Sequence, residues 1–484
     1  MYRKIYCFAG IVGLAISLWF AIAPSRLPIE LVLVGLFFAL RKKQWVNDVI
    51  QWLDKTLEAN PDKSLAFVLA VGCVMRLAYV LINPGVLGAH HQLPTGDYTL
   101  LWGQAKDFAR GTWPESKSWT TVVFFGFVAK LFGDSLVAAF AFASLLSACS
   151  ALVAFDLAKR WFNKKAGLIT AAFIFLSPFL SGHCGNVATE HTYVFFTLLA
   201  LWAATLVSTV KSRVSTFVLA FACALVSFAA MWSRGEGVML LIVLPIVFVV
   251  DYFSRHVRTV CGLLGMLVGI AFVCAIAVSV NFKTGNGVTI FSSNDNLWPR
   301  LFGASLEHNG RMNKEDCQMI WQRYKVDHPD CDWPLTSPTG VPFRIVGHCP
   351  KEIAPYVREE TTRRWKSMSF GDMVMLFIKK EMVWWGNPIG YDISWDVSLI
   401  GHCVARLGGI LFPAAIVLLA VMFFANFNRS SFKCSFVLFA PAIMLGMNFA
   451  ILAVAEVGER YTVLLHVMWP LYAAAFVTSG LKDI

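Results

Sequence analysis

The sequence predicts an all-helical membrane protein that crosses the bilayer many times. Of its 484 residues, 57% are hydrophobic and only 15% are charged, whereas a soluble globular protein has about 25% charged residues. Apolar stretches of the length that a spanning helix needs, about 20 residues, recur along the chain. These two observations exclude a soluble enzyme and predict a polytopic all-α fold.

About twelve spans are predicted by this length test. The first resembles the hydrophobic part of a signal peptide, but no convincing small-residue cleavage site follows it, so we interpret it as a retained helix. Very short connections near residues 210 and 234 join neighbouring spans. The predicted spans are 5–22, 27–41, 64–84, 135–158, 166–182, 191–210, 213–232, 237–251, 259–281, 397–425, 434–455 and 461–479.

Lys and Arg residues are concentrated in the connections on one side of the membrane, as in Arg41–Lys43 and Lys159–Lys165. An excess of basic residues marks cytoplasmic loops, so both termini are predicted to be cytoplasmic. The same clustering accounts for the net charge of +11 without a nucleic-acid partner. The loops predicted to face outward are 85–134, 183–190, 233–236, 283–396 and 456–460.

The order of spans and loops divides the chain into four regions. Residues 1–63 hold two spans and a cytoplasmic amphipathic segment, and residues 64–281 form a transmembrane core with its first outer loop. Residues 282–396 form an extracytoplasmic region, and residues 397–484 hold the last spans.

Two outer stretches, Trp119–Phe132 and Met373–Trp385, are predicted to be helices that lie in the membrane interface. Three of the twelve cysteines, Cys317, Cys331 and Cys349, share the long outer region. One disulfide can form among them if that side is oxidising, although an odd number leaves the pairing open. Most of the other cysteines lie in apolar stretches and are expected to be small buried hydrophobes.

Two carboxylates at the outer face are candidate catalytic groups. Asp97 follows Gly96 where the chain leaves a predicted span, and a carboxylate there can accept a proton from an acceptor hydroxyl. The alternative is an ordinary helix N-cap. Glu190 directly precedes an apolar run, and its very short loop holds it near the membrane plane. It is either a functional acid or a charge at a helix end.

Two arginines at the same face are candidate phosphate ligands. Arg234 lies in Ser233–Gly237, between two apolar runs, and Arg460 lies in Glu456–Tyr461. The planar guanidinium donates paired hydrogen bonds that suit phosphate. Alternatively, each is an interface arginine that snorkels or pairs with a neighbouring glutamate.

A divalent metal is a further hypothesis for the first outer loop. Glu115 and the pair His90 and His91 are its candidate ligands. Carboxylate oxygens suit magnesium or manganese, and histidine suits zinc. No spacing here is diagnostic, and solvated loop residues are the alternative.

The order of these features resembles the GT-C superfamily of integral-membrane glycosyltransferases. Within it, the chain is most similar to the protein O-mannosyltransferases and the bacterial lipid A aminoarabinose transferase, over roughly residues 64–281 and about the last thirty residues. The features, in chain order, are Asp97, Ala129–Ser135, Leu157–Phe162, Leu176–Phe179, Thr189–Glu190, Ser233–Gly237, Glu459–Tyr461 and Trp469–Pro470.

The resemblance implies a GT-C fold and an inverting transfer of sugar from a polyprenyl-phosphate donor at the outer face. It implies that Asp97 is the base or positions the acceptor, and that Glu190 assists. It implies that Arg234 and Arg460, with the adjacent Tyr461, hold the donor phosphate. Some members of the family bind a metal through an acid of the first loop, for which Glu115 is the candidate. A bacterial inner membrane with a periplasmic active site is the expected location.

The chain departs from the family pattern in several places. Spans 5–22 and 27–41 precede the family-like first helix, and loop 283–396 matches no family segment that we can align. The second-loop acid is Glu190, where the family often has Asp, and Arg234 is followed by glycine before Glu236. The sugar therefore stays open, and the acceptor is a glycan, a lipid or a protein.

Two functions of other classes compete with this interpretation. A transporter or lipid flippase places charges in mid-membrane and commonly has paired halves, whereas these spans are nearly free of charge and no halves match. An O-antigen polymerase or ligase predicts essential arginines in the large outer loop and a dispensable Asp97.

Overall fold

The computed structural model describes most of the first 283 residues after Ala59 and two helical regions further on. The described residues are 59–82, 97–112, 118–176, 180, 187–255, 259–283, 288, 290, 301, 302, 305, 314–329 and 353–377, with isolated positions within 44–56 and 440–474. They belong to two compact units, Met1–Ser292 with Asp392–Leu445 and Val463–Ile484, and Ser293–Tyr391 with Gly446–Thr462. The described residues are helical or connect helices, and none of them forms a strand.

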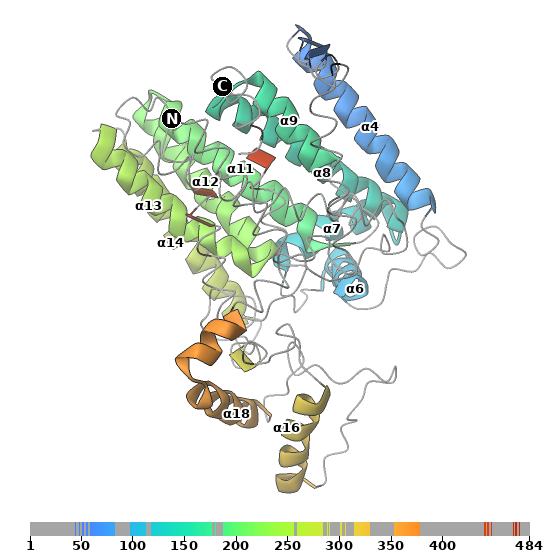
Figure 1. Ribbon diagram of the computed structural model, residues 1–484, viewed down its shortest axis with the longest axis vertical. Helices are drawn as coiled ribbons and strands as arrows, with labels where there is room; N and C mark the ends of the chain where they lie inside the picture. The colour runs from blue at the N-terminus through green and yellow to red at the C-terminus, as the bar shows by residue number, and fades with distance from the viewer. Residues whose placement is uncertain are drawn as a thin grey trace. The chain divides into compact units, whose positions relative to one another are not determined.

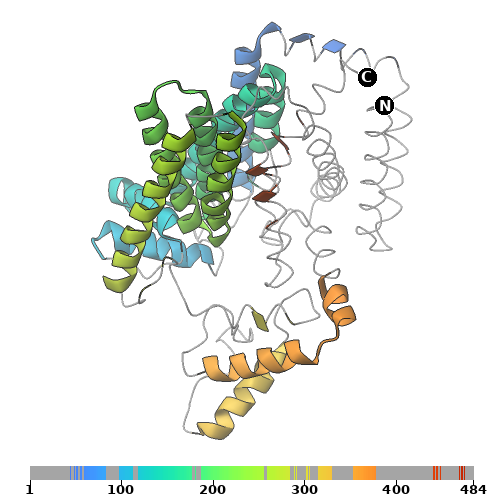
Figure 2. The same ribbon diagram turned by 90° about the vertical axis from the view of Figure 1, so that its left-hand side faces the viewer.

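The first unit is built of helices that pack side by side (Figure 1). Helix α11 packs against α8 and α12, and α12 packs against α14. The shorter helices α6 and α7 pack on each other at one end of the longer ones (Figures 1 and 2). The elements are α4 (Pro61–Ile82), α6 (Asp97–Ala109), α7 (Trp119–Phe132), α8 (Leu136–Trp161), α9 (Lys164–Phe175), α11 (Thr189–Thr209), α12 (Arg213–Ser233), the 3-10 turn η1 (Gly235–Gly237), α13 (Val238–Arg255) and α14 (Thr259–Lys283).

Four of the described helices are long and apolar enough to cross a membrane. They are Leu136–Trp161, Thr189–Thr209, Arg213–Ser233 and Val260–Lys283. The predicted spans between 64 and 281 all fall on described helices, although α9 ends at Phe175, seven residues before its predicted end. Spans 5–22, 27–41 and 397–425 lie outside the described residues, and 434–455 and 461–479 contain only isolated described positions. The count of twelve therefore stays a prediction.

Short polar residues and glycines set the local structure of these helices. Asn163 caps α9, because its Oδ1 accepts from the amide of Ala166 at 2.8 Å. Gly133 ends α7 at φ 67°, a conformation that side chains disfavour. A Cβ at Gly265 of α14 would lie 2.3 Å from the carbonyl oxygen of Phe217 in α12. Such close backbone approach through small residues is a common way for helices to pack in membranes.

Arg76 and Asp156 are charged residues inside helices that the sequence predicted to be nearly free of charge. Arg76 of α4 is 1% exposed and donates to the carbonyl oxygen of Phe175 at 2.6 Å and to Ser147 Oγ at 2.7 Å. Phe175 is the last residue of α9, where a cation is favoured by the helix dipole. Asp156 of α8 accepts from Trp202 Nε1 at 2.8 Å. Both charges therefore join neighbouring helices.

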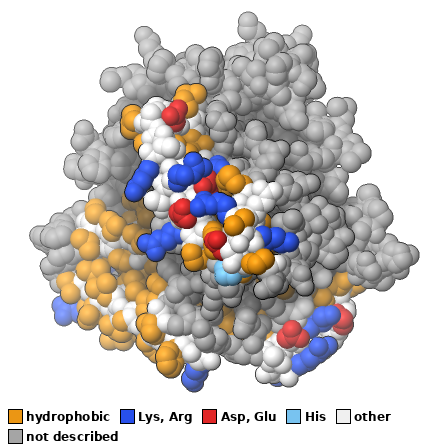
Figure 3. Space-filling view, turned by 90° about the horizontal axis from the view of Figure 1, so that it is seen from below, with side chains coloured by type: hydrophobic (Ala, Val, Ile, Leu, Met, Phe, Trp, Pro, Cys, Tyr) orange, Lys and Arg blue, Asp and Glu red, His pale blue; other side chains and the backbone are white. Residues whose placement is uncertain are grey.

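The second unit contains α16 (Lys314–Asp327), α18 (Ala354–Ser367) and the helical residues 370–377. Its apolar core holds Phe302, Ile320 and Trp321. The carboxylate of Glu360 is held by Arg363 and Arg364 at 2.6 and 2.8 Å. Seen from below, basic and acidic side chains are mixed over these helices, which is typical of a solvated surface (Figure 3). The interfacial helix predicted from Met373 is described only as far as residue 377.

Candidate functional site

Helix α6 begins at Asp97, the carboxylate that the sequence singled out. Further along this helix, Trp102 Nε1 donates to Asp134 Oδ1 at 2.8 Å, and Lys106 Nζ donates to Asp134 Oδ2 at 2.9 Å. The hydrogen bond from Lys106 holds the pKa of Asp134 below its usual range. Asp134 lies in the turn between α7 and α8, so this contact fixes α6 against the rest of the first unit.

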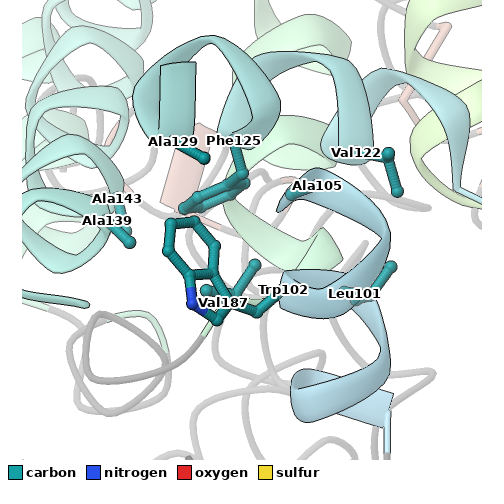
Figure 4. Packing of buried hydrophobic residues seen from close by; sticks show 9 residues of the cluster. All are labelled: Leu101, Trp102, Ala105, Val122, Phe125, Ala129, Ala139, Ala143 and Val187. Carbon is teal, nitrogen blue, oxygen red and sulfur yellow. The ribbon is translucent and has the colours of Figure 1, made fainter. Parts of the chain in front are cut away.

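One apolar cluster joins α6 to the start of α11. Trp102 of α6 packs with Phe125 of α7 and with Val187, which lies three residues before Glu190 (Figure 4). The helix that Asp97 begins and the segment that carries Glu190 are therefore parts of one packed core. The buried members of the cluster are Leu101, Trp102, Ala105, Val122, Phe125, Ala129, Ala139, Ala143 and Val187.

The centre of the candidate site is a buried ion pair between Glu190 and Arg234. Glu190 is in the first turn of α11 and is completely buried. Arg234 follows the last residue of α12, and its Nη1 donates to Glu190 Oε1 at 2.6 Å. Thr189 Oγ1 accepts from the same Nη1 and donates to Glu190 Oε2, both at 3.3 Å. Both side chains are almost completely withdrawn from water, so removing either partner would leave the other charge buried at a high cost in free energy.

A second carboxylate, Glu236, approaches the other arm of the same guanidinium. Glu236 Oε1 lies 3.3 Å from Arg234 Nη2, and the Glu236 side chain is 17% exposed. Glu236 is the middle residue of the 3-10 turn η1, which the amide of Gly237 closes by donating to the carbonyl of Arg234 at 2.9 Å. One arginine therefore lies between two acids that differ in burial and in distance.

Contacts from α7 hold the helices around this ion pair. Thr121 Oγ1 and Thr192 Oγ1 share a hydrogen bond of 2.7 Å, which joins α7 to α11. The ring of Trp119 lies 6.0 Å from that of Trp232, which joins the start of α7 to the end of α12. Because α7 contacts both helices, it fixes the end of α11 that carries Glu190 relative to the end of α12 that precedes Arg234.

The structure brings together two of the residues that the sequence proposed, Glu190 and Arg234. Asp97 is described only as the first residue of α6. Glu115, Arg460 and Tyr461 lie outside the described residues.

The predicted alternative, in which Arg234 pairs with a neighbouring glutamate, correctly anticipated its contact with Glu236. Two other contacts of the site were not predicted. Pairing with Glu190, 44 residues away, depends on how α11 and α12 pack. The contacts of Asp134 with α6 were also missed, because they depend on how α6 packs against the turn between α7 and α8.

Within the described part of the chain, no three potential metal ligands gather. Glu190 and Glu236 both contact the guanidinium of Arg234, so these two carboxylates bind a cation that the protein itself supplies. The described residues therefore give no fit for the expected metal, and Glu115 is not among them.

The middle of the chain matches a known family. Residues 118–278, about a third of the chain, match the model described as dolichyl-phosphate-mannose-protein mannosyltransferase. The matched segment runs from the start of α7 into α14 and includes both Glu190 and Arg234. A comparison with curated protein sequences finds no match.

Solved structures of the oligosaccharyltransferase of Archaeoglobus fulgidus are similar in fold. The complex of this enzyme, AglB, with an inhibitory peptide and a dolichol-phosphate matches with a TM-score of 0.50 at 14% identity. The crystal structure of the apo form matches with a TM-score of 0.51 at 13% identity. Both comparisons cover 87% of this chain and 51% of the other, so the chain spans about half the length of these proteins. At such low identity the likeness shows a shared fold.

Proposed function

We propose that this protein, a member of the GT-C superfamily of membrane glycosyltransferases, transfers a sugar from a polyprenyl-phosphate donor to an acceptor hydroxyl at the outer face of the membrane. The observation that carries the proposal is the buried pair of Glu190 and Arg234, held beside the core that anchors α6. The segment similar to the mannosyltransferase family contains this pair. A buried ion pair is weak evidence for a stabilising role, and we assign this one a role in function.

Asp97 is the proposed base. The acceptor oxygen attacks the anomeric carbon of the sugar, and its proton passes to the carboxylate of Asp97. The bond between the anomeric carbon and the donor phosphate oxygen breaks, and the bonding pair leaves with the phosphate. A single displacement of this kind inverts the anomeric centre.

Arg234 is the proposed ligand of the departing phosphate, whose negative charge grows in the transition state. A fixed cation at that point lowers the barrier without having to reorganise. Glu190 is then a positioning residue, because its carboxylate holds Arg234 Nη1 at 2.6 Å and is itself fully buried. The resemblance gives Arg460 and Tyr461 the same task as Arg234, and we retain both as proposed phosphate ligands.

The donor and the acceptor are proposed by class. The archaeal complex contains a dolichol-phosphate and a peptide, and by analogy the donor of this protein is a sugar on a polyprenyl phosphate such as undecaprenyl phosphate. A glycan, a lipid or a protein is the acceptor. The proposed location is a bacterial inner membrane with the site facing the periplasm. A divalent metal (Mg, Mn or Zn) near Glu115 is part of the family analogy, and no step is derived through it.

The decisive experiment is sugar transfer in membranes that carry Asp97→Asn, with the lipid-linked sugar pool measured in the same cells. Asp107→Asn is the matched control, since Asp107 is on the same helix but is exposed and contacts Arg110. We expect Asp97→Asn to abolish transfer and to raise the donor pool, while Asp107→Asn does neither. Normal transfer by Asp97→Asn, with loss on replacing arginines of the outer region such as Arg323, would instead support a polymerase or ligase.

A further inference from the structure

The two arms of the Arg234 guanidinium are held very differently. Nη1 is 2.6 Å from a carboxylate that has no solvent exposure, and the hydroxyl of Thr189 supports both partners. Nη2 is 3.3 Å from Glu236, whose side chain reaches solvent. A charge-assisted hydrogen bond is normally 2.7–2.9 Å long, so the contact with Glu236 is the weaker of the two. One arm is thus fixed and the other can exchange its partner.

The backbone around Glu236 is fixed on one side and open on the other. A Cβ at Gly237 would lie 2.3 Å from the amide nitrogen of Met231, so the turn packs directly on the last turns of α12. A Cβ at Gly235 would have no neighbour within 4 Å. The turn that carries Glu236 is therefore packed against α12 at Gly237, whereas it is not tightly packed at Gly235.

The charges of this group also favour exchange. Glu190 and Glu236 bring two carboxylates to the single guanidinium of Arg234. An approaching phosphate is repelled by the carboxylate of Glu236 for as long as that carboxylate stays beside Arg234. Movement of Glu236 away from Arg234 removes this repulsion and lets Nη2 donate to a phosphate oxygen instead.

We propose that Glu236 occupies the phosphate-binding arm of Arg234 when no donor is bound, and that the donor phosphate displaces it. This inference rests on the proposed function of the site and adds a specificity-determining residue to it. The hydrogen bond between Arg234 Nη2 and Glu236 is exchanged for one between Nη2 and a phosphate oxygen, and no covalent bond changes. Glu236 thus sets how tightly the lipid phosphate binds, whereas Glu190 sets where the guanidinium lies.

The test is the affinity of the purified full-length protein in detergent for undecaprenyl phosphate, compared between wild type and Glu236→Gln. Glutamine keeps the size of the side chain and removes the competing charge. We expect Glu236→Gln to bind undecaprenyl phosphate about tenfold more tightly, because the phosphate no longer competes with a carboxylate for the hydrogen bond from Arg234 Nη2. Undecaprenol, which lacks the phosphate, should bind both proteins equally.

Glu359→Gln is the matched control. Glu359 also contacts an arginine, with Oε1 2.8 Å from Arg323 Nη2, but it lies on the exposed surface of α18. We expect this variant to bind undecaprenyl phosphate as wild type does. Folding of every variant is checked by its thermal unfolding in the same detergent.

The outcomes separate this inference from the proposed function. Unchanged or weaker binding of undecaprenyl phosphate by a folded Glu236→Gln protein overturns the role of Glu236, even if sugar transfer is intact. Tighter binding supports that role, even if no sugar transfer is found. In transfer assays, a lower KM for the lipid-linked donor supports exchange, whereas a fall in kcat with an unchanged KM contradicts it.

Discussion

Trp102 and Asp134 are joined by a hydrogen bond of 2.8 Å that fixes the helix beginning at Asp97 to the turn between α7 and α8. Lys106, one turn further along α6, contacts the same carboxylate. Trp102 follows Asp97 by five positions in α6, so the contact lies close to the proposed base. Disruption of this contact is therefore expected to change the position of α6 while the rest of the fold stays intact.

Asp134→Asn should loosen α6. The carboxylate is 64% exposed, so its ion pair with Lys106 contributes only about 0.2–1 kcal/mol. Amide hydrogen exchange of residues 97–109 should become about twofold to fivefold faster, while that of α8 stays unchanged. Equal exchange rates in the variant and the wild type would mean that the apolar cluster alone holds α6.

The same contact gives a pH dependence. The pKa of Asp134 is lowered by its hydrogen bond from Lys106, so the stabilisation is present above the ordinary value of 3.8. It is lost as the pH falls through the still lower pKa of the folded state. The difference in exchange between wild type and Asp134→Asn should therefore be full at pH 6 and should shrink below pH 3.8. A constant difference over this range would contradict an ionic contribution.

Glu190 and Arg234 should behave as one unit in a double-mutant cycle. Glu190→Gln or Arg234→Gln alone leaves a buried charge without its main partner, which typically costs about 3–5 kcal/mol of stability. The double variant removes both charges, so it should be destabilised by much less than the sum of the singles. Thermal or denaturant unfolding in detergent measures the coupling. Additive effects would show that the two side chains are independent.

Arg76→Leu should destabilise the first unit. It leaves the buried carbonyl of Phe175 and the hydroxyl of Ser147 without the guanidinium that bonds them. Hydrogen bonds to charged groups contribute about 1.5–3 kcal/mol each, so a loss of several kcal/mol is expected. Arg110→Leu is the control, because Arg110 is exposed on α6. Thermal unfolding of both variants in detergent would distinguish a structural arginine from a dispensable one.

Gly265→Ala should separate α12 from α14. The new Cβ would lie 2.3 Å from the carbonyl oxygen of Phe217, and a backbone contact of that kind can be relieved only by moving the helices. Overpacking of this sort costs about 1–3 kcal/mol. Gly103→Ala is the matched control, because a Cβ there meets nothing within 4 Å. Equal unfolding temperatures for the two variants would contradict the close packing.

Hydropathy correctly predicted the helical class. The ordered motifs predicted a relation to the GT-C superfamily, and residues 118–278 do match the mannosyltransferase family model, while the archaeal oligosaccharyltransferase shares the fold. Boundaries were less accurate where polar residues lie inside the protein. The predicted span 191–210 omits Thr189 and Glu190, yet both belong to α11. A hydropathy scale treats Glu190 as exposed, because it cannot include the neutralising contact with Arg234.

The stretch Trp119–Phe132 illustrates the other limit. Its composition predicted a helix in the membrane interface, and the structure has a helix with these bounds. Trp119 and Phe125 are nevertheless buried inside the first unit. Apolar side chains that face lipid and those that face protein have the same composition, so only the packing of α6, α8 and α12 around α7 distinguishes them.

The contact of Arg76 with the last carbonyl of α9 bears on how the protein can be shortened. The family-like segment begins at residue 118, which suggests that residues 118–278 would make a minimal fragment for expression. Arg76 and all of α6 lie upstream of that boundary. A fragment that begins at residue 118 would lose Arg76, which donates to the last carbonyl of α9, and α6, which contributes Trp102 to the apolar core. A useful truncation must therefore begin before α4, however well the shorter segment matches.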